Sequence, residues 1–143
     1  MMIRSAVADD LPAVHGLLAE AGLVLGGLAE LGDGLIVAEH DGRVVGAVGV
    51  ERHGPDALLR SLVVAPPVRG TGLGDALTAA AVEHAKRATL DAIWLLTETA
   101  GPFFAARGFV RVDRAGAPTA IAASHEFSKA CPASAAFMRR ALA

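Results

Sequence analysis

The sequence of 143 residues contains no tyrosine, one tryptophan and one cysteine. A single cysteine, Cys131, cannot form a disulfide within the chain, which is typical of a reducing compartment. So few aromatic side chains argue against a surface that stacks carbohydrate or single-stranded nucleic acid. The formal net charge of −2 also provides no basic face for DNA or RNA. We therefore expect no nucleic-acid partner.

Long apolar runs are missing too, although hydrophobic residues make up 53% of the chain. No stretch approaches the roughly 18 uncharged apolar residues that a membrane-spanning helix requires. The first residues, Met1–Arg4, lack the charged and then apolar pattern of a secretory signal. Charged residues make up 20%, a balance that favours a globular fold over disorder. We expect a cytoplasmic protein with no membrane partner, folded as one domain over residues 1–143.

Hydrophobic periodicity and turn residues predict the order strand, helix, three strands, helix, strand, helix and two strands. The predicted strands cover residues 2–7, 35–39, 43–52, 57–64, 93–97, 109–112 and 136–142. The predicted helices cover 9–22, 73–88 and 100–107, with a helical stretch near 119–129. This order indicates an α/β (α+β) domain with a mixed central sheet of about six to seven strands flanked by helices.

Local signals mark several boundaries of these elements. Asp9 is the expected N-cap of the first helix, and Asp41-Gly42 predicts a tight hairpin turn. Residues 22–34 contain five glycines, which indicates a loop or a short mobile helix. Arg60 and Ser61 interrupt an otherwise apolar strand, so we expect the arginine to face the rim or a cleft.

Three glycines at alternate positions, Gly70, Gly72 and Gly74, lie between a predicted strand and a predicted helix. Glycine lets an anion approach the backbone, and the free N–H groups and dipole of a helix start attract phosphate. A P-loop would need Gly-Lys-Ser/Thr, and a dinucleotide fold would need a different glycine spacing. Neither pattern fits, and a flexible turn that merely uses glycine stays the alternative.

The segment Arg69-x-x-Gly72-x-Gly74, preceded by Leu62–Val64, resembles the acetyl-CoA motif Arg/Gln-x-x-Gly-x-Gly/Ala of the GNAT N-acetyltransferases. Phe103–Phe109 resembles the segment that follows the fifth strand in that family. The resemblance extends over nearly the whole chain. It implies a GNAT-like domain in which the pantetheine arm of coenzyme A lies in a splay between the fourth and fifth strands.

The resemblance also implies which residues contact the cosubstrate. Backbone groups of Leu62, Val63 and Val64 would pair with the pantetheine and the acetyl carbonyl. The pyrophosphate would be held, without a metal ion, by Arg69 and by Gly70, Thr71, Gly72, Leu73, Gly74 and Asp75. Phe104 occupies the position where the family usually has a tyrosine that protonates the leaving thiolate. Phenylalanine has no proton to give, so water, a serine or the substrate must do this, or the thiolate leaves unassisted.

Two carboxylates are candidate bases for the acceptor amine. Glu51 is at the end of the third predicted strand, and Glu98 follows the fifth; the alternative for each is a solvated charge. Arg60 and Arg52 are candidates for binding an anionic group of the substrate. Thr97 is a candidate contact for the cofactor or the amine.

The carboxyl-terminal sequence, including Ala117-Pro118, Glu126-Phe127 and Cys131-Pro132, is similar to the arsenic-resistance ArsN-type acetyltransferases. This resemblance implies transfer of acetyl from acetyl-CoA to the primary amine of a small, amino-acid-like molecule, such as an arsinothricin-type compound. Direct attack in a ternary complex is the expected route. A homodimer is a further expectation from the family. The alternative hypothesis is a non-catalytic acyl-CoA-binding sensor or partner protein, because the tyrosine is missing.

Overall fold

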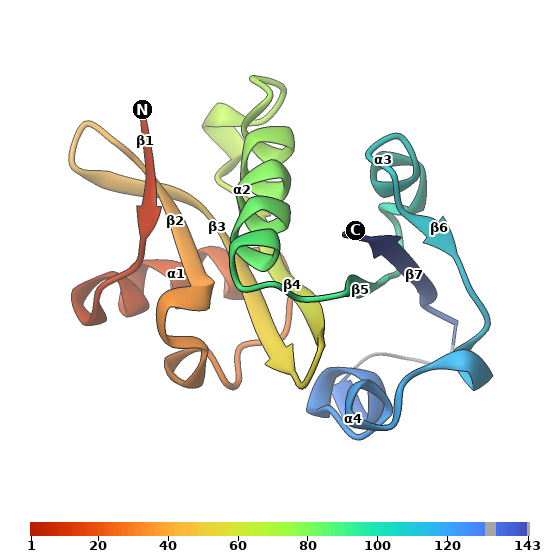
Figure 1. Ribbon diagram of the computed structural model, residues 1–143. Helices are drawn as coiled ribbons and strands as arrows, with labels where there is room; N and C mark the ends of the chain where they lie inside the picture. The colour runs from red at the N-terminus through yellow and green to blue at the C-terminus, as the bar shows by residue number, and fades with distance from the viewer. Residues whose placement is uncertain (131–133, 143) are drawn as a thin grey trace. The chain divides into compact units, whose positions relative to one another are not determined.

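A computed structural model describes residues 1–130 and 134–142 of the chain (Figure 1). Seven strands form one mixed sheet in the order β1-β2-β3-β4-β5-β7-β6. The pair β4–β5 is parallel, and the pairs β1–β2, β2–β3, β5–β7 and β6–β7 are antiparallel. The predicted α+β class with a mixed sheet and helices is therefore confirmed.

The strands and helices follow one another in the predicted order. The strands are β1 (Met2–Ser5), β2 (Leu35–His40), β3 (Arg43–His53), β4 (Asp56–Val64), β5 (Ala92–Thr97), β6 (Val110–Arg111) and β7 (Ala136–Ala141). The helices are α1 (Leu11–Glu20), α2 (Leu73–Arg87), α3 (Gly101–Ala105) and α4 (Thr119–Ala122). The chain divides into two compact units: a first unit of Met1–Glu51 and Leu59–His84, and a second unit of Arg52–Leu58 and Ala85–Ala143.

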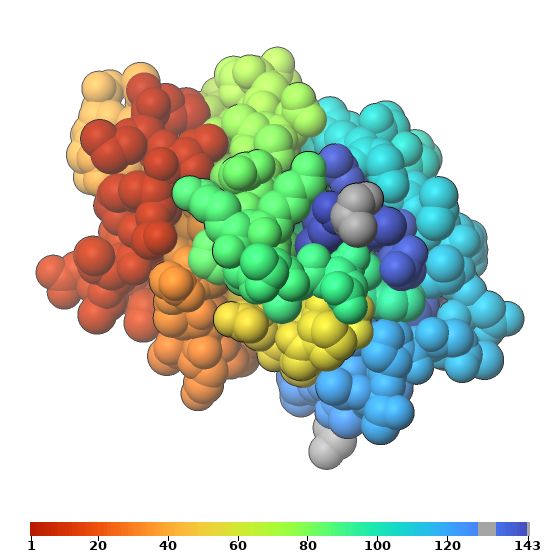
Figure 2. Space-filling model, viewed as in Figure 1, coloured from red at the N-terminus to blue at the C-terminus, as the bar shows by residue number. Residues whose placement is uncertain are grey.

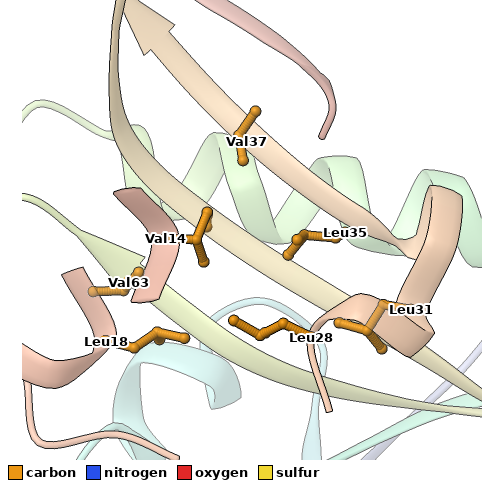
Figure 3. Packing of buried hydrophobic residues seen from close by; sticks show 8 residues of the cluster. Val14, Leu18, Leu28, Leu31, Leu35, Val37 and Val63 are labelled. Atoms are coloured by element: carbon orange, nitrogen blue, oxygen red, sulfur yellow. The ribbon is translucent and has the colours of Figure 1, made fainter. Parts of the chain in front are cut away.

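In the first unit, α1 and α2 cover opposite faces of the strands. Successive side chains of a strand point to opposite faces. At Ala47 of β3, the side chain joins the buried cluster of α1, which includes Val14 and Leu18. At Gly46, a side chain would instead meet Leu73 and Leu77 of α2. Figure 1 shows α2 in front of these strands. The members of the α1 cluster, most of them labelled in Figure 3, are Val14, Leu18, Leu28, Leu31, Leu35, Val37, Ala47 and Val63.

The hairpin between β2 and β3 has the turn that the sequence predicts. Asp41 and Gly42 have φ values of 52° and 75°, so both occupy the left-handed region, as a type I′ turn requires. The turn pairs His40 with Arg43 and sets the antiparallel register, which shifts once between Ala38 and Glu39.

In the second unit, β7 lies between β5 and β6 in an antiparallel arrangement. β4 enters this unit through Asp56–Leu58, which pair with Ala92–Trp94 of β5. The indole of Trp94 stacks on Phe137 with ring centroids 5.2 Å apart, and its N–H donates to Asp56 Oδ1 at 2.9 Å. The buried members of this core are Leu58, Ala92, Trp94, Ile121 and Phe137.

The start of the first helix differs from the prediction. β1 ends at Ser5, and a short 3-10 helix of Ala8–Asp10 comes before α1, so Asp9 is not the N-cap. The carboxylate of Asp10 accepts hydrogen bonds from the Val7 N–H at 2.8 Å and from Arg4 at 2.7 Å. These contacts keep the turn before the helix closed and move the helix start to Leu11.

The segment before β2 is packed rather than open. A 3-10 helix covers Ala29–Gly34, and Leu28 and Leu31 belong to the buried core. Gly34 is required because a side chain there would collide with the carbonyl oxygen of Val50. Of the two alternatives for residues 22–34, a loop or a short mobile helix, a short helix is present at Ala29–Gly34.

The predicted helix near 119–129 is interrupted. α4 ends at Ala122, and a π-helical turn covers Glu126–Ala130. Between them, the hydroxyl of Ser124 donates to the Ile121 carbonyl at 2.6 Å and accepts from the Phe127 N–H at 3.3 Å. Serine competes in this way with the regular helical bonds. Cys131 lies outside the described residues.

Candidate active site

The connection from β4 to α2 contains the glycines singled out in the sequence. Val63, next to the end of β4, is 5% exposed and packs in the α1 cluster, while Leu62 and Val64 are half-buried. After a 3-10 turn over Pro66–Val68, the chain is exposed from Arg69 to Gly72. Figure 2 shows this segment, in light green, at the surface of the viewed face.

Gly70 and Gly72 have φ values of 80° and 86°, which L side chains rarely adopt. Apart from the adjacent residues of the chain, no heavy atom lies within 4 Å of the place where a Cβ would be at either glycine. Glycine is therefore needed here for the backbone conformation, and space remains beside the backbone. The hydroxyl of Thr71 donates to the Val68 carbonyl at 2.6 Å and holds the turn.

The start of α2 provides donors that the helix itself does not use. The first N–H to form a hydrogen bond of the helical type, to the carbonyl four residues earlier, is that of Ala76, which donates to Gly72 at 3.0 Å. The N–H groups of Leu73 and Gly74 come before it, at positions that have no intrahelical partner. Together with the helix dipole they favour an anion at this end. Leu73, 4% exposed, anchors the turn in the core.

Arg69 lies beside this turn. Its Nε donates to the Val64 carbonyl at 3.2 Å, which ties the exposed side chain to the end of β4. The guanidinium keeps its charge at every physiological pH. The exposed turn therefore combines a fixed cation with the helix start of α2, and this combination suits a phosphate-bearing ligand.

Arg60 is buried, so of the two expected positions, the rim or a cleft, the structure excludes the rim. Its side chain is 3% exposed and forms an ion pair with Glu51, with Nη1 3.1 Å from Oε2. Nη2 donates to the Gly26 carbonyl, and Nε donates to the Ser61 hydroxyl at 3.1 Å. A buried cation must find such partners because desolvation is costly. Glu51 is 24% exposed, so this candidate base is paired and only partly solvated.

Ser61, next to Arg60, has a backbone conformation that the sequence did not predict. It is 9% exposed and has a φ of 60°, in the left-handed region, inside a strand. A non-glycine residue there is strained, and such residues gather at functional sites. The run Leu58–Val64 shows no turn residue that would reveal this conformation; the only signal is the polar pair Arg60-Ser61 among apolar neighbours.

The remaining candidates belong to the second unit. Thr97 ends β5, and its Oγ1 accepts a hydrogen bond from the Ala100 N–H at 3.0 Å, just before α3. Arg52 and Glu98 are exposed. The structure thus joins Glu51 with Arg60 directly, whereas Thr97 is the last residue of β5 and Glu98 follows it.

Phe104 is part of the aromatic packing of the second unit. It is 5% exposed and meets Phe103 and Phe109 edge to face, with centroids 5.1 and 5.5 Å apart. The N–H groups of Arg107 and Phe109 both donate to its carbonyl, and Gly108 closes the turn with a φ of 88°. The ring therefore stabilises α3 and the turn after it.

Among the described residues, no group of three His, Cys, Asp or Glu side chains could hold a metal ion. None of their helices has the length and apolar character needed to cross a membrane.

Comparison with known proteins gives a family match. The model of the acetyltransferase (GNAT) domain matches residues 32–111, more than half of the chain, from just before β2 to β6. Among curated proteins, no sequence matches the chain.

Solved structures with the same fold are numerous. N-acetylglutamate synthase from Neisseria gonorrhoeae, complexed with coenzyme A and N-acetyl-glutamate, superposes with a TM-score of 0.86 at 22% identity. That match covers 99% of this chain but only 35% of the synthase chain, so this chain spans about a third of its length. Rv2747 from Mycobacterium tuberculosis, in complex with CoA, gives 0.85 at 23% identity and covers 100% of both chains. A GNAT-family acetyltransferase from Staphylococcus aureus gives 0.81 at 16% identity and covers 99% of both.

Proposed function

The chain belongs to the acetyltransferase (GNAT) family, and from this premise we propose that it is an N-acetyltransferase that acetylates the primary amine of a small, amino-acid-like molecule. The acetyl donor is acetyl-CoA. The observation that carries the proposal is the exposed turn Arg69–Gly72 before α2, which lies inside the matched segment. We further propose that residues 1–143 act as one domain.

The turn and the helix start would bind the pyrophosphate of the cosubstrate. Gly70 and Gly72 leave the backbone accessible, the N–H groups of Leu73 and Gly74 would donate to the anion, and Arg69 would add charge. The pantetheine would pair with the backbone of Leu62–Val64. Solved structures of the same fold contain coenzyme A, which supports this proposal.

The reaction needs a neutral amine, a stabilised oxyanion and a leaving thiolate. The amine nitrogen attacks the thioester carbon, and its proton passes to a carboxylate or to water. The C–S bond then breaks, and the sulfur leaves as a thiolate. Because a thiol has a pKa of about 8.5, the thiolate can leave without protonation by a general acid. This agrees with Phe104, which is buried and has no proton to donate.

Two observations support the proposed acceptor class: the cations of this chain and its likeness in fold to a protein that binds an amino-acid derivative. N-acetyl-glutamate is bound in the Neisseria synthase structure. Here Arg52 is exposed, while Arg60 is buried against Glu51. Of the two candidates, Arg52 is therefore the more accessible cation for an anionic head group. The ArsN-type resemblance adds the finer proposal that this head group is an arsinate, as in arsinothricin.

The experiment measures thiol release from acetyl-CoA by the full chain with a panel of amines. The panel contains glutamate, glutamine, arginine, arsinothricin and an uncharged amine such as ethanolamine. We expect release to be stimulated by an amino acid with an anionic side chain. If CoA binds but no amine stimulates release, the catalytic proposal fails and a CoA-binding module takes its place.

A further inference from the structure

The side chains of Arg60 and Ser61 meet, although they are neighbours on a strand. In a regular strand, successive side chains point to opposite faces. Here the left-handed φ of 60° at Ser61 breaks the alternation, and Ser61 Oγ lies 3.1 Å from Arg60 Nε. The strained conformation thus brings a hydroxyl and a guanidinium together on one side of β4.

The hydrogen bond between them has only one possible direction. A guanidinium donates and cannot accept, so Arg60 Nε–H donates to Ser61 Oγ. The hydroxyl keeps its own hydrogen for another acceptor, and none is found for it among residues 1–130 and 134–142. Since Ser61 is 9% exposed, its hydroxyl is a buried donor that has no acceptor among these residues. The hydrogen bond from Arg60 fixes the position of the hydroxyl oxygen.

Arg60 is held in place from three sides. Glu51 pairs with Nη1, the Gly26 carbonyl accepts from Nη2, and Ser61 accepts from Nε. Gly27 allows this approach, because a side chain there would begin 2.9 Å from Nη1. A buried cation with so many contacts cannot swing away, so the Ser61 hydroxyl has a defined position.

We propose that the Ser61 hydroxyl donates a hydrogen bond to the carbonyl oxygen of the thioester as that oxygen becomes an oxyanion. This inference rests on the proposed function, which places the thioester along the adjacent residues Leu62–Val64. When the amine nitrogen bonds to the carbonyl carbon, the carbonyl π electrons move to oxygen. The Ser61 O–H then donates a hydrogen bond to this negatively charged oxygen. When the C–S bond breaks, the electrons return, and serine keeps its proton throughout.

Arg60 acts through Ser61 as a positioning residue. Its charge polarises the hydroxyl, because a donor that itself accepts a charged hydrogen bond becomes a stronger donor. The pair would supply electrostatic stabilisation, a contribution that does not depend on the tyrosine missing at Phe104. The competing explanation is that Ser61 only caps the buried guanidinium.

Two variants separate these explanations. Ser61→Ala removes the hydroxyl and keeps the strain, while Ser61→Gly removes the hydroxyl and relieves the strain. Loss of an oxyanion donor lowers kcat by about 10²-fold, and we expect this loss in both variants. The dissociation constant of CoA should stay unchanged. Ser61→Gly should melt above Ser61→Ala, because both variants lose the acceptor of Arg60 Nε and only glycine relieves the strain.

A third variant tests the role of Arg60. Arg60→Lys keeps the charge but loses the Nε donor. We expect it to lower kcat in the wild-type background and to have little further effect in the Ser61→Ala background, because the two residues act as a unit.

The outcomes can be told apart. If wild-type chain shows no amine-stimulated release, the proposed function fails, and this inference fails with it. If wild-type chain is active and both Ser61 variants keep kcat within about threefold, far from the loss of about 10² for an oxyanion donor, only the role of Ser61 is overturned. A loss in Ser61→Ala that Ser61→Gly restores would assign Ser61 a structural role instead.

Discussion

The Arg60 guanidinium and the Glu51 carboxylate approach to 3.1 Å, and only 3% of the arginine side chain is exposed. The pair connects β4 with β3 inside the first unit. Its two members have different surroundings, since Glu51 is 24% exposed. The carboxylate therefore neutralises a buried charge and is still accessible to water. Its contribution to the free energy of unfolding and its contribution to the reaction rate are measured in two separate experiments.

Glu51→Gln should destabilise the protein, because it leaves the buried Arg60 charge without its counterion. A hydrogen bond to a charged group contributes about 1.5–3 kcal/mol, and we expect a loss of that order in the free energy of unfolding. Urea denaturation at pH 7 measures it. Glu98→Gln is the matched control: Glu98 is exposed, so its change should stay within about 0.5 kcal/mol. If the two variants had equal free energies of unfolding, the ion pair of Glu51 with Arg60 would not contribute to stability.

The same two variants identify the amine base. If Glu51 takes the proton, kcat/KM of Glu51→Gln falls and loses the acidic limb of its pH profile, while Glu98→Gln keeps the wild-type profile. The measurement is initial rate against pH with the best amine of the panel. A profile altered in Glu98→Gln alone would transfer the role to Glu98.

Gly72→Glu should abolish CoA binding without unfolding the chain. The substitution puts a carboxylate where we place the pyrophosphate, and it adds strain of about 1–3 kcal/mol from the φ of 86°. Gly54→Glu is the control, because Gly54 also has a positive φ, 64°, and no neighbour within 4 Å. Isothermal titration with CoA should show binding in the control only. Unchanged affinity in Gly72→Glu would remove the pyrophosphate from this turn.

The ion pair of Asp10 with Arg4 predicts a pH dependence of stability. Hydrogen bonds from Arg4 and from the Val7 N–H lower the pKa of Asp10 below its ordinary value of 3.8. A lowered pKa in the folded state stabilises the fold above pH 3.8, and this stabilisation disappears as pH falls through the lowered pKa. Asp10→Asn should therefore melt below the wild type at pH 7, and the difference should shrink toward pH 2–3.

The neighbouring change Asp9→Asn serves as the control for this experiment, because Asp9 is exposed and its carboxylate has no such hydrogen bond to any residue that the structure describes. Its melting temperature should match that of the wild type at both pH values. A difference between Asp10→Asn and the wild type that stays constant with pH would show that charge on Asp10 contributes nothing.

Local signals in the sequence predicted much of the fold. Asp41-Gly42 predicts its turn because both residues tolerate positive φ, and the turn then sets the strand register. The conformation of Ser61 was not predictable, because nothing local distinguishes it from an ordinary strand residue. The contact of Arg60 with Gly26 spans 34 residues, so only the folded chain brings the two together. The break at Ser124 depends on a side-chain hydrogen bond that helix periodicity does not reveal.

Trp94 provides a test of the single-domain proposal. It is the only tryptophan and reports on the second unit, whereas far-UV circular dichroism reports on all helices and strands. β4 and α2 each contribute residues to both units, which favours one cooperative transition. We expect the two signals to give coincident urea curves, as two-state unfolding requires. Separate midpoints would show that the units unfold independently.

The backbone at Ser61 also bears on how this protein can evolve. Replacing the serine by glycine would relieve the unfavourable conformation but would also remove the acceptor of Arg60 Nε, so selection for heat resistance alone would favour glycine together with a second change that supplies a new acceptor. A population selected for turnover would retain serine. Position 61 is therefore where laboratory evolution under these two pressures should diverge first, and sequencing the survivors would show which property the natural chain has kept.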